Sequence, residues 1–334
     1  MFFKGCPLRC QWCSNPESQS GKVQVTWDAA KCIGCGKCIR ECPENAISKS
    51  KDVILIDHEK CKGWQKCIAG CPASCFQVEG QYKTVAEIVA KVVKDKDFYE
   101  ESGGGVTLSG GEVLQQIDVA LALLQELKRH NIHRAVETTG YTSSTLFEKF
   151  LDQVDLVLFD LKHYDPVRHK TGTGVDNKII LQNMSLAVEK NKNIIARIPV
   201  IPAFNDSLQD AEGFCTLLLA MGIKTVNLLP FHQFGQKKYE LLGMEEIRQG
   251  FLPEIQVDIP NWAGYDTVFV GSPNWWSNIA PPVQAFIKVH DQQVEVGHKM
   301  VANKRVPAVV ELYRTLKAKG LADTAKNVFE QCWP

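Results

Sequence analysis

The cysteines of this chain lie mostly in its first quarter, and they limit what that part can fold into. Eleven of the 13 cysteines precede residue 76. They fall into three groups with the short spacings of iron–sulfur ligands. Segments this small cannot bury a large hydrophobic core, so metal binding would supply much of their folding free energy. Cysteines in cluster spacings also favour a reducing cytosol over a disulfide-bonded secreted protein, which predicts a cytoplasmic location.

The first group has the spacing Cys-x3-Cys-x2-Cys and consists of Cys6, Cys10 and Cys13. Three thiolates suit three corners of a [4Fe–4S] cube, whose full complement is four. One iron is then left open to bind a substrate, much as a catalytic zinc keeps one position free. Gly5 and Pro7 favour a turn over a helix in this loop. The alternatives are a zinc site or three buried structural thiols, but a zinc knuckle needs a fourth local cysteine or histidine.

The residues around this triplet carry a family resemblance. The segment reads Phe3-Lys4-Gly5-Cys6-Pro7-Leu8-Arg9-Cys10-Gln11-Trp12-Cys13-Ser14-Asn15-Pro16-Glu17-Ser18. It resembles the cluster loop of radical S-adenosylmethionine (SAM) enzymes and is most similar to the activating enzymes of glycyl-radical enzymes. The resemblance implies a cluster on the three cysteines whose open iron is chelated by the methionine part of SAM. It also implies that Trp12, Cys13 and Ser14 lie beside the adenosine.

The resemblance also implies a function. An electron from such a cluster splits the sulfonium of SAM into methionine and a 5′-deoxyadenosyl radical, which takes a hydrogen atom from the Cα of one glycine on a partner enzyme. The chain would be an anaerobic oxidoreductase that activates a glycyl-radical enzyme, with reduced flavodoxin or ferredoxin as electron donor. Three alternatives stay open: an iron–sulfur electron-transfer protein, a truncated inactive activating enzyme, and an enzyme with a small-molecule substrate. The kind of partner also stays open, among pyruvate formate-lyase-like enzymes, diol dehydratases and aryl-acetate decarboxylases.

The second and third cysteine groups resemble the two halves of a bacterial ferredoxin. The first half has the spacing Cys-x2-Cys-x2-Cys-x3-Cys-Pro, and its cysteines are Cys32, Cys35, Cys38 and Cys42. In two-cluster ferredoxins the fourth cysteine of such a run ligates the other cluster, so a second half should follow. That half contains Cys61, Cys67 and Cys71, the last again followed by proline. Trp64 stands where its second cysteine belongs, and Cys75 lies four residues past Cys71.

This spacing predicts a ferredoxin-like α+β insert over residues 23–80 with up to two auxiliary [4Fe–4S] clusters. The first cluster would be held by Cys32, Cys35, Cys38 and Cys71. The second would be held by Cys42, Cys61 and Cys67, with Cys75 as its fourth ligand; if Cys75 cannot reach, this cluster is three-iron, labile or absent. Strands are expected at Val53–Ile56 and Phe76–Val78. The insert would serve as an electron relay or a docking platform.

After Gln81 the pattern changes to alternating helices and strands. Helices are expected at residues 84–93, 113–130, 145–152, 177–190 and 208–221, and strands at 106–108, 135–138, 156–161, 194–200 and 225–229. Repeated βα units predict an α/β fold with a parallel sheet or barrel and active groups at the carboxyl ends of the strands. The resemblance implies a partial (β/α)6 barrel made of residues 1–22 and 81–244.

Polar motifs follow three of these strands. Ser109-Gly110-Gly111-Glu112 has glycines that permit close backbone approach and a carboxylate that can accept from an ammonium group. It resembles the family's Gly-Gly-Glu motif, which contacts the amino group of SAM. Glu137-Thr138-Thr139-Gly140 and Asp160-Leu161-Lys162 resemble segments that touch SAM and a nearby monovalent cation. The oxygen donors for that cation would be Glu137, Thr138 and Asp160. Salt bridges at the rim of the barrel are the alternative.

Two further residues are candidates for the SAM site. Arg197 lies in a strongly apolar strand, so it is either a core ion pair or a ligand to SAM. His232 is similar to the histidine that closes the family's adenosine site, although a lone histidine at a strand end is commonly structural. Cys215 lies on an apolar helical stripe and is expected to pack in the core. The charged run from Lys91 to Asp97 is expected to be a solvated face.

Composition excludes several classes of protein. Lys+Arg and Asp+Glu are both 38, so nothing indicates a nucleic-acid or membrane surface. No apolar run reaches about 18 residues, which argues against a transmembrane helix. The first four residues run straight into the cluster loop, which argues against a signal peptide. At 334 residues the chain has room for two or three domains.

The resemblance has two departures. Family members normally begin with a further strand and an Asp-Gly-Pro-Gly-x-Arg-Thr element, whose loss would expose a sheet edge and remove part of the SAM site. Beyond Met244, within a C-terminal part spanning 250–334, residues 264–288 resemble the middle of a flavodoxin-like protein. A phosphate loop is missing there, so FMN binding is not expected, and Trp275 and Trp276 are expected to pack. Helices are expected at 306–319 and 321–331.

Overall fold

The computed structural model describes residues 1–232 and 235–244. The flavodoxin-like fragment, its two tryptophans and the last two expected helices lie outside the described residues. None of the helices in the described ranges is both long and apolar enough to cross a membrane.

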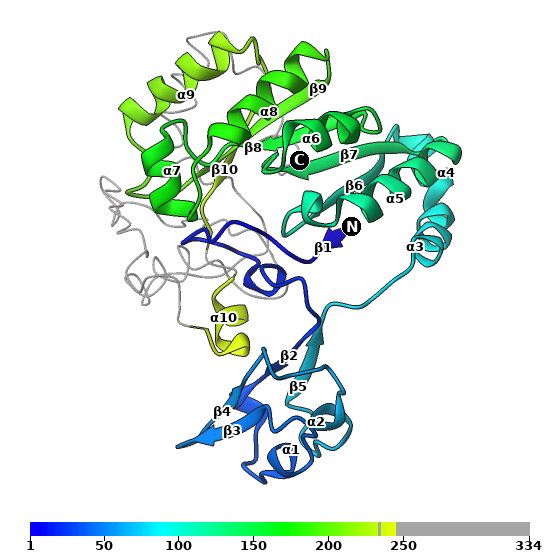
Figure 1. The fold of residues 1–334 in the computed structure, drawn as a ribbon, viewed down its shortest axis with the longest axis vertical. Helices are drawn as coiled ribbons and strands as arrows, with labels where there is room; N and C mark the ends of the chain where they lie inside the picture. The colour runs from blue at the N-terminus through cyan, green and yellow to red at the C-terminus, as the bar shows by residue number, and fades with distance from the viewer. Residues whose placement is uncertain (233–234, 245–334) are drawn as a thin grey trace, which may run out of the picture.

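The main body is built on one parallel sheet of six strands (Figure 1). In sheet order these are β1 (Phe2–Phe3), β6 (Gly105–Gly110), β7 (His133–Thr138), β8 (Leu156–Asp160), β9 (Asn193–Val200) and β10 (Val226–Pro230). Every neighbouring pair is parallel, so all carboxyl ends meet at one edge. The predicted α/β fold with a parallel sheet is confirmed, and β1 pairs with β6 through Phe2 opposite Ser109 and Phe3 opposite Gly110.

Helices connect the strands and cover the sheet. They are α3 (Val85–Val92), α4 (Lys96–Ser102), α5 (Ile117–Arg129), α6 (Ser144–Leu151), α7 (Pro166–Thr173), α8 (Lys178–Glu189), α9 (Leu208–Ala220) and α10 (Gln236–Leu242). Single 3-10 turns are η1 (Pro16–Ser18), η2 (Ala29–Lys31), η3 (Val93–Asp95) and η4 (Val113–Gln116). The helix expected at 113–130 therefore starts as a 3-10 turn. α7 was not predicted, although Asp165 caps its first turn by accepting from Arg168 N–H and Pro166 follows at the first helical position.

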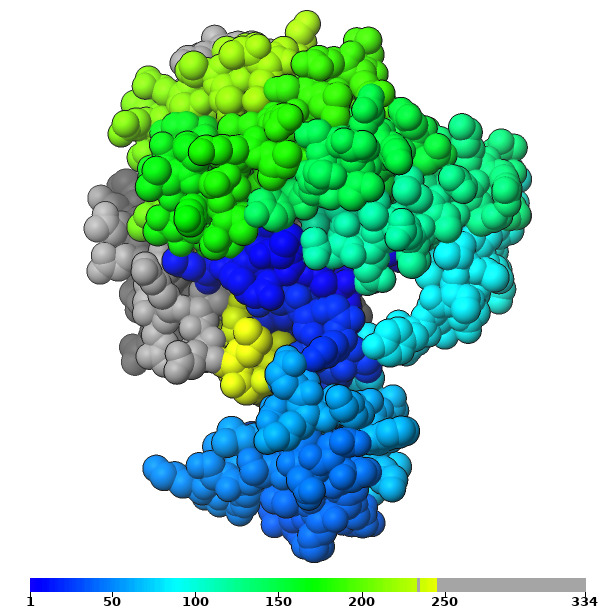
Figure 2. All heavy atoms as spheres, viewed as in Figure 1, coloured from blue at the N-terminus to red at the C-terminus, as the bar shows by residue number. Residues whose placement is uncertain are grey.

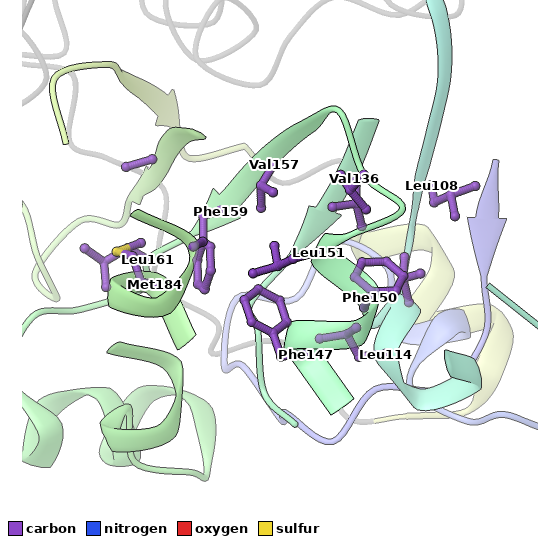
Figure 3. Packing of buried hydrophobic residues seen from close by; sticks show 14 of the residues in the cluster. Leu108, Leu114, Val136, Phe147, Phe150, Leu151, Val157, Phe159, Leu161 and Met184 are labelled. Carbon is purple, nitrogen blue, oxygen red and sulfur yellow. The ribbon is translucent and has the colours of Figure 1, made fainter. Parts of the chain in front are cut away.

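The hydrophobic core lies between the sheet and its helices (Figure 3). Phe147 and Phe150 of α6 are fully buried, as is Phe159 of β8. The rings of Phe147 and Phe159 meet nearly edge-on with centroids 5.9 Å apart. Burying one such side chain contributes about 1.5–3 kcal/mol, so this cluster supplies much of the stability that holds the strand ends in place. Cys215 is fully buried, which confirms it as a core residue, and the charged side chains from Lys91 to Asp97 are not buried, as expected.

Residues 23–80 form a smaller lobe beneath the sheet in Figure 1. It contains two antiparallel pairs, β2 (Gln24–Trp27) with β5 (Phe76–Glu79) and β3 (Ile47–Ser50) with β4 (Val53–Ile56). Two one-turn helices, α1 (Lys37–Arg40) and α2 (Lys66–Ala69), lie between the strands in sequence. Both expected strands are present, the second extended by one residue. The small core consists of apolar side chains with cysteines packed against them, so the lobe has little else to bury.

Candidate active site

The loop that carries Cys6, Cys10 and Cys13 follows β1 and lies at the carboxyl edge of the sheet. Backbone hydrogen bonds fix its start: Gly111 N–H donates to Phe3 O (2.9 Å) and Glu112 N–H donates to Gly5 O (2.7 Å). Gly5 N–H in turn donates to Ser18 O (2.8 Å), which closes the loop on itself. Gly5 has φ +99°, a conformation that glycine adopts without strain. The loop is therefore positioned by main-chain contacts to the segment after β6.

The C-terminal end of α7 holds the far side of the loop. Arg9 N–H donates to Thr173 O (2.7 Å). Trp12 is buried and packs against Phe204, with ring centroids 4.5 Å apart. A Cβ on Gly172 would come within 2.8 Å of Trp12, so the absence of a side chain there leaves room for the indole. The structure thus places the Trp12 ring in a packed position, and its predicted place beside an adenosine stays a prediction.

Helix α10 holds the end of the loop. Tyr239 Oη donates to Cys13 O (2.8 Å), and Lys238 Nζ donates to Asn15 Oδ1 (2.8 Å) and Glu17 Oε1 (2.7 Å). Burial, together with the nearby Cys13 and Cys10 thiolates, raises the pKa of Tyr239, so its hydroxyl remains a donor. Sequence spacing gives no sign of these contacts, because Lys238 and Tyr239 lie more than 220 positions from the loop. Figure 2 shows this helix, in yellow, beside the dark-blue N-terminal segment.

Two thiols of this loop, those of Cys6 and Cys10, are costly to ionise without a metal. Burial raises the pKa of Cys10 to about 12 and that of Cys6 to about 11. Lys162 is the cation that opposes both shifts. Although burial disfavours its charge, the Asp160 carboxylate and the Cys10 thiolate raise the pKa of Lys162 overall. A site that keeps an ammonium beside partly buried thiols is suited to thiolates bound to a positively charged centre.

No three His, Cys, Asp or Glu side chains in residues 1–232 and 235–244 are close enough together to hold a single metal ion. Each thiolate of an iron–sulfur cube binds a different iron, so cluster ligands stand farther apart than the ligands of one ion. The predicted cluster ligands and the predicted cation site both stay predictions.

The Glu112 carboxylate is buried and receives four hydrogen bonds from the chain. Thr139 supplies its hydroxyl (2.6 Å) and its N–H (2.9 Å), Thr138 supplies its hydroxyl (2.5 Å), and Leu114 supplies its N–H (3.2 Å). Burial nevertheless raises the pKa of Glu112. The side chain therefore ties the end of β6 to the end of β7. The predicted contact of this motif with an amino group stays a prediction, and the structure adds an internal role for its carboxylate.

The remaining strand ends carry two ion pairs. Lys162 Nζ donates to Asp160 Oδ2 (2.9 Å). Arg197 pairs with Glu137, which also accepts from Ser109 Oγ. Of the three oxygen donors expected for a cation, Thr138 donates to Glu112 and the two carboxylates each hold a basic side chain. Arg197 is thus in an ion pair, which was one of its two expected roles.

Two buried polar atoms of these pairs are left over. Asp160 Oδ1 and Arg197 Nε have no hydrogen-bond partner among the described residues. Buried polar groups in folded proteins nearly always have hydrogen-bond partners. A polar ligand bound at this edge of the sheet would supply partners for this acceptor and this donor. These atoms fit a ligand that carries both an ammonium and a carboxylate, as the methionine part of SAM does. His232 follows β10 at the same edge.

A histidine behind the loop was also missed. His163 is fully buried next to Lys162, and its Nδ1 accepts from Asp165 N–H (3.0 Å). Its Nε2 lies 3.3 Å from Asp210 Oδ1, which also accepts from Arg168 Nη1 (2.6 Å). Burial and the Arg168 charge, only partly offset by Asp210 and Asp165, lower the pKa of His163 to about 4. The imidazole is neutral at pH 7 and packs against Phe204, with ring centroids 5.2 Å apart.

This histidine predicts a pH dependence of stability. An unfolded histidine takes up a proton below about pH 6.5, whereas folded His163 does so only near pH 4. The contribution of the neutral imidazole to the free energy of unfolding is therefore fully present above pH 6.5 and is lost as the pH falls toward 4. His163→Gln should make the fall in unfolding free energy between pH 7 and pH 5 smaller by about 2 kcal/mol. Urea unfolding at both values measures this. His133→Gln, at an exposed position, is the control, and equal pH dependences in His163→Gln and the parent would contradict the prediction.

The insert brings its cysteines into two sets. Cys32, Cys35, Cys38, Cys71 and Cys75 line one cavity. Cys67 lies with Cys61 and Cys42, whose charges together with burial raise its pKa to about 11. Four of the five cysteines in the cavity are the predicted ligands of the first cluster. The fifth, Cys75, was expected in the second set, and the structure places it with the first.

Comparison with known proteins agrees with this geometry. The family model of the radical SAM superfamily matches residues 1–215. A choline trimethylamine-lyase activating enzyme of Oleidesulfovibrio alaskensis is 42% identical over 73% of this chain and 81% of its own length. A trans-4-hydroxy-L-proline dehydratase activating enzyme of Clostridioides difficile is 44% identical over 72% of this chain and 80% of its own. The pyruvate formate-lyase 2-activating enzyme of Escherichia coli K12 is 37% identical, covering 73% and 74%.

The fold, the cysteine loop and these relatives agree on one class of protein. The chain belongs to the radical SAM superfamily and, within it, to the activating enzymes of glycyl-radical enzymes.

Proposed function

We propose that this chain activates a partner glycyl-radical enzyme, with Cys6, Cys10 and Cys13 holding the catalytic [4Fe–4S] cluster. The observation that carries the proposal is the position of the three cysteines in one loop, beside the unpaired buried atoms of Asp160 and Arg197. A reduced cluster of this kind supplies the electron that splits SAM and so provides the radical that abstracts hydrogen from a glycine Cα. No protein general base is needed for that abstraction.

The residues of the chain would bind and orient the two groups. Lys162 keeps a positive charge next to the buried thiolates, which favours their ionised form. Asp160 Oδ1 is a free acceptor for the ammonium of SAM, and Arg197 Nε is a free donor for its carboxylate. The segment Gly110-Gly111-Glu112 would contact the amino end of SAM, while Trp12, Cys13, Ser14 and His232 would lie toward its adenosine.

The insert would deliver electrons to this site. Its two cysteine sets would hold the auxiliary clusters, reduced in turn by flavodoxin or ferredoxin in the cytoplasm. A monovalent cation would be bound near Glu137, Thr138 and Asp160, with the acidic side chains turning from their present basic partners toward it. Neither nucleic acid nor a membrane is a proposed partner.

The test is the transfer of the radical to a partner. We expect the anaerobically reconstituted and reduced protein, given SAM, to produce 5′-deoxyadenosine and to raise a glycyl-radical EPR signal on one member of a panel of candidate partners. The panel starts from the enzymes named for the relatives: choline trimethylamine-lyase, trans-4-hydroxy-L-proline dehydratase and pyruvate formate-lyase. The matched control is the same partner with its radical-bearing glycine replaced by alanine, which should give no signal.

The alternatives predict other outcomes. An electron-transfer protein would be reduced without forming 5′-deoxyadenosine, and an inactive chain would bind no SAM. Cleavage of SAM with no radical on any glycyl-radical enzyme would favour a small-molecule substrate.

A further inference from the structure

The two halves of the insert repeat in three dimensions. Corresponding residues are 29 positions apart, as Cys32 and Cys61 are. Gly34 and Gly63 share φ +72°, and Asn45 and Ser74 share φ +49°. The helices α1 and α2 occupy matching positions, each preceded by a left-handed residue. The halves can therefore be compared residue by residue.

In this comparison Trp64 occupies the position of the missing ligand of the second cluster, and Cys75 does not. Trp64 corresponds to Cys35, the second cysteine of the first half, and Cys75 corresponds to Ala46. Ala46 is a buried residue whose N–H donates to Cys42 Sγ (3.3 Å). A residue at this position thus packs behind the fourth cysteine of its own half, which ligates the cluster of the other half.

The contacts of Cys75 agree with this assignment. Its Sγ lies 3.2 Å from Cys71 Sγ, and Cys32 is another thiol that lines the same cavity. Both belong to the predicted first ligand set. Cys75 lines the same cavity as that set, and none of the second set lines it.

Around the second set, the position of the absent cysteine is filled by an indole. Trp64 Nε1 donates to Glu44 Oε1 (2.8 Å), two residues after Cys42. The Trp64 residue is 63% exposed, so its ring lies over the outside of the lobe rather than in its core. Cys67 has Cys61 and Cys42 as its neighbouring thiols. This set therefore contains three cysteines, and the residue at the sequence position of the fourth is Trp64.

We propose that the second auxiliary cluster is held by three thiolates only, those of Cys42, Cys61 and Cys67, and that Cys75 contacts the ligand Cys71 of the first cluster instead. The proposal rests on the clusters of the proposed function. A cube with three thiolates has one iron without a protein sulfur, and that iron leaves readily on mild oxidation to give a three-iron cluster.

The test uses the full chain with Cys6, Cys10 and Cys13 replaced by alanine, so that only the insert carries iron. After anaerobic reconstitution and mild oxidation, EPR should show about one three-iron cluster per chain. Trp64→Cys should abolish that signal and retain about one more iron per chain, because the first half has a cysteine at the corresponding position. Cys75→Ala should keep the signal at full intensity, because Cys75 is no ligand of this cluster.

Each result bears on the proposal. A full iron load with no three-iron signal in the parent would overturn it, as would a second cluster that is lost in Cys75→Ala. If Trp64→Cys does not fold, the Cys75→Ala comparison still decides whether Cys75 is a ligand. Absence of any iron in the parent insert would instead overturn the auxiliary clusters themselves, while 5′-deoxyadenosine formation by the unmodified chain tests the catalytic site separately.

Discussion

A Cys10→Ala variant is expected to form 5′-deoxyadenosine from SAM more than about 100-fold more slowly than the parent. Mutating residues that only hydrogen-bond to metal ligands already lowers metal affinity or activity by about 10–100-fold, and the loss of a ligand itself should cost more. Burial raises the pKa of Cys10 to about 12, so this thiol ionises at neutral pH only when a metal binds it. Alanine would leave two thiolates at the site and remove one of the negative charges that favour the ammonium of Lys162. Chromatographic quantification of 5′-deoxyadenosine after anaerobic reconstitution checks this prediction, together with the iron content.

The matched control is Cys215→Ala. Cys215 is also fully buried, but it lies on α9 within the hydrophobic core. Its replacement removes one sulfur from the core and should leave product formation within about twofold of the parent, since no cluster ligand changes. Product formation by Cys10→Ala at the rate of the Cys215→Ala control would contradict the assignment of the cluster loop.

Gly111→Ala is expected to have the second largest effect. A Cβ on Gly111 would overlap the carbonyl oxygens of Gly5 and Ser18. Both are main-chain atoms, so neither can rotate away as a side chain would, and the cluster loop would have to shift. Such overpacking costs about 1–3 kcal/mol. The variant should therefore unfold at lower denaturant concentration and lose most of the iron bound at Cys6, Cys10 and Cys13.

The control for this prediction is another glycine of the same region. Gly21 has an ordinary φ, and a Cβ there would meet only Gly5 Cα, at 3.9 Å, which is normal van der Waals contact. Gly21→Ala should therefore keep its iron and its stability. Iron counting on reconstituted protein and urea unfolding compare the two variants, and equal behaviour would show that the close approach at Gly111 is unimportant.

Local patterns in the sequence were sufficient for much of the fold. The strands β6 to β10 of the parallel sheet were predicted within a few residues, because apolar runs separated by amphipathic helices report burial directly. α7 was missed because its sequence contains glycine and three threonine or histidine residues and has little apolar periodicity. Its Asp165-Pro166 start was the signal that would have found it.

The candidate site was predicted less completely, because its side chains find partners far away in the sequence. Gly110 and Gly111 permit another group to approach the backbone closely, and in the structure that group is the main chain of Phe3, Gly5 and Ser18. The carboxylate of Glu112 turns inward to two threonines that follow the next strand. Spacing indicated which residues carry polar groups at strand ends, but it could not indicate which of those groups satisfy one another.

The position of Cys75 shows that spacing can also fail to predict contacts between residues that are close in sequence. Its distance from Cys71 in sequence allowed it to complete the second ligand set. The left-handed turn at Ser74 and the strand that follows place its side chain with the first set instead. The internal repeat of the insert contained the necessary signal, since Ala46 is its counterpart, and only a comparison of the two halves residue by residue reveals it.

Helix α10 joins the insert to the segment beside the cluster loop through its contacts. It contacts β2 of the insert and η1 next to the cluster loop, and its Tyr239 donates to Cys13 O while Lys237 Nζ lies 3.7 Å from Asp28. If the insert delivers electrons as proposed, this helix of seven residues would help to hold the insert against the loop of the catalytic cluster. A substitution in this helix would then be expected to alter the rate of electron delivery without changing any cluster ligand.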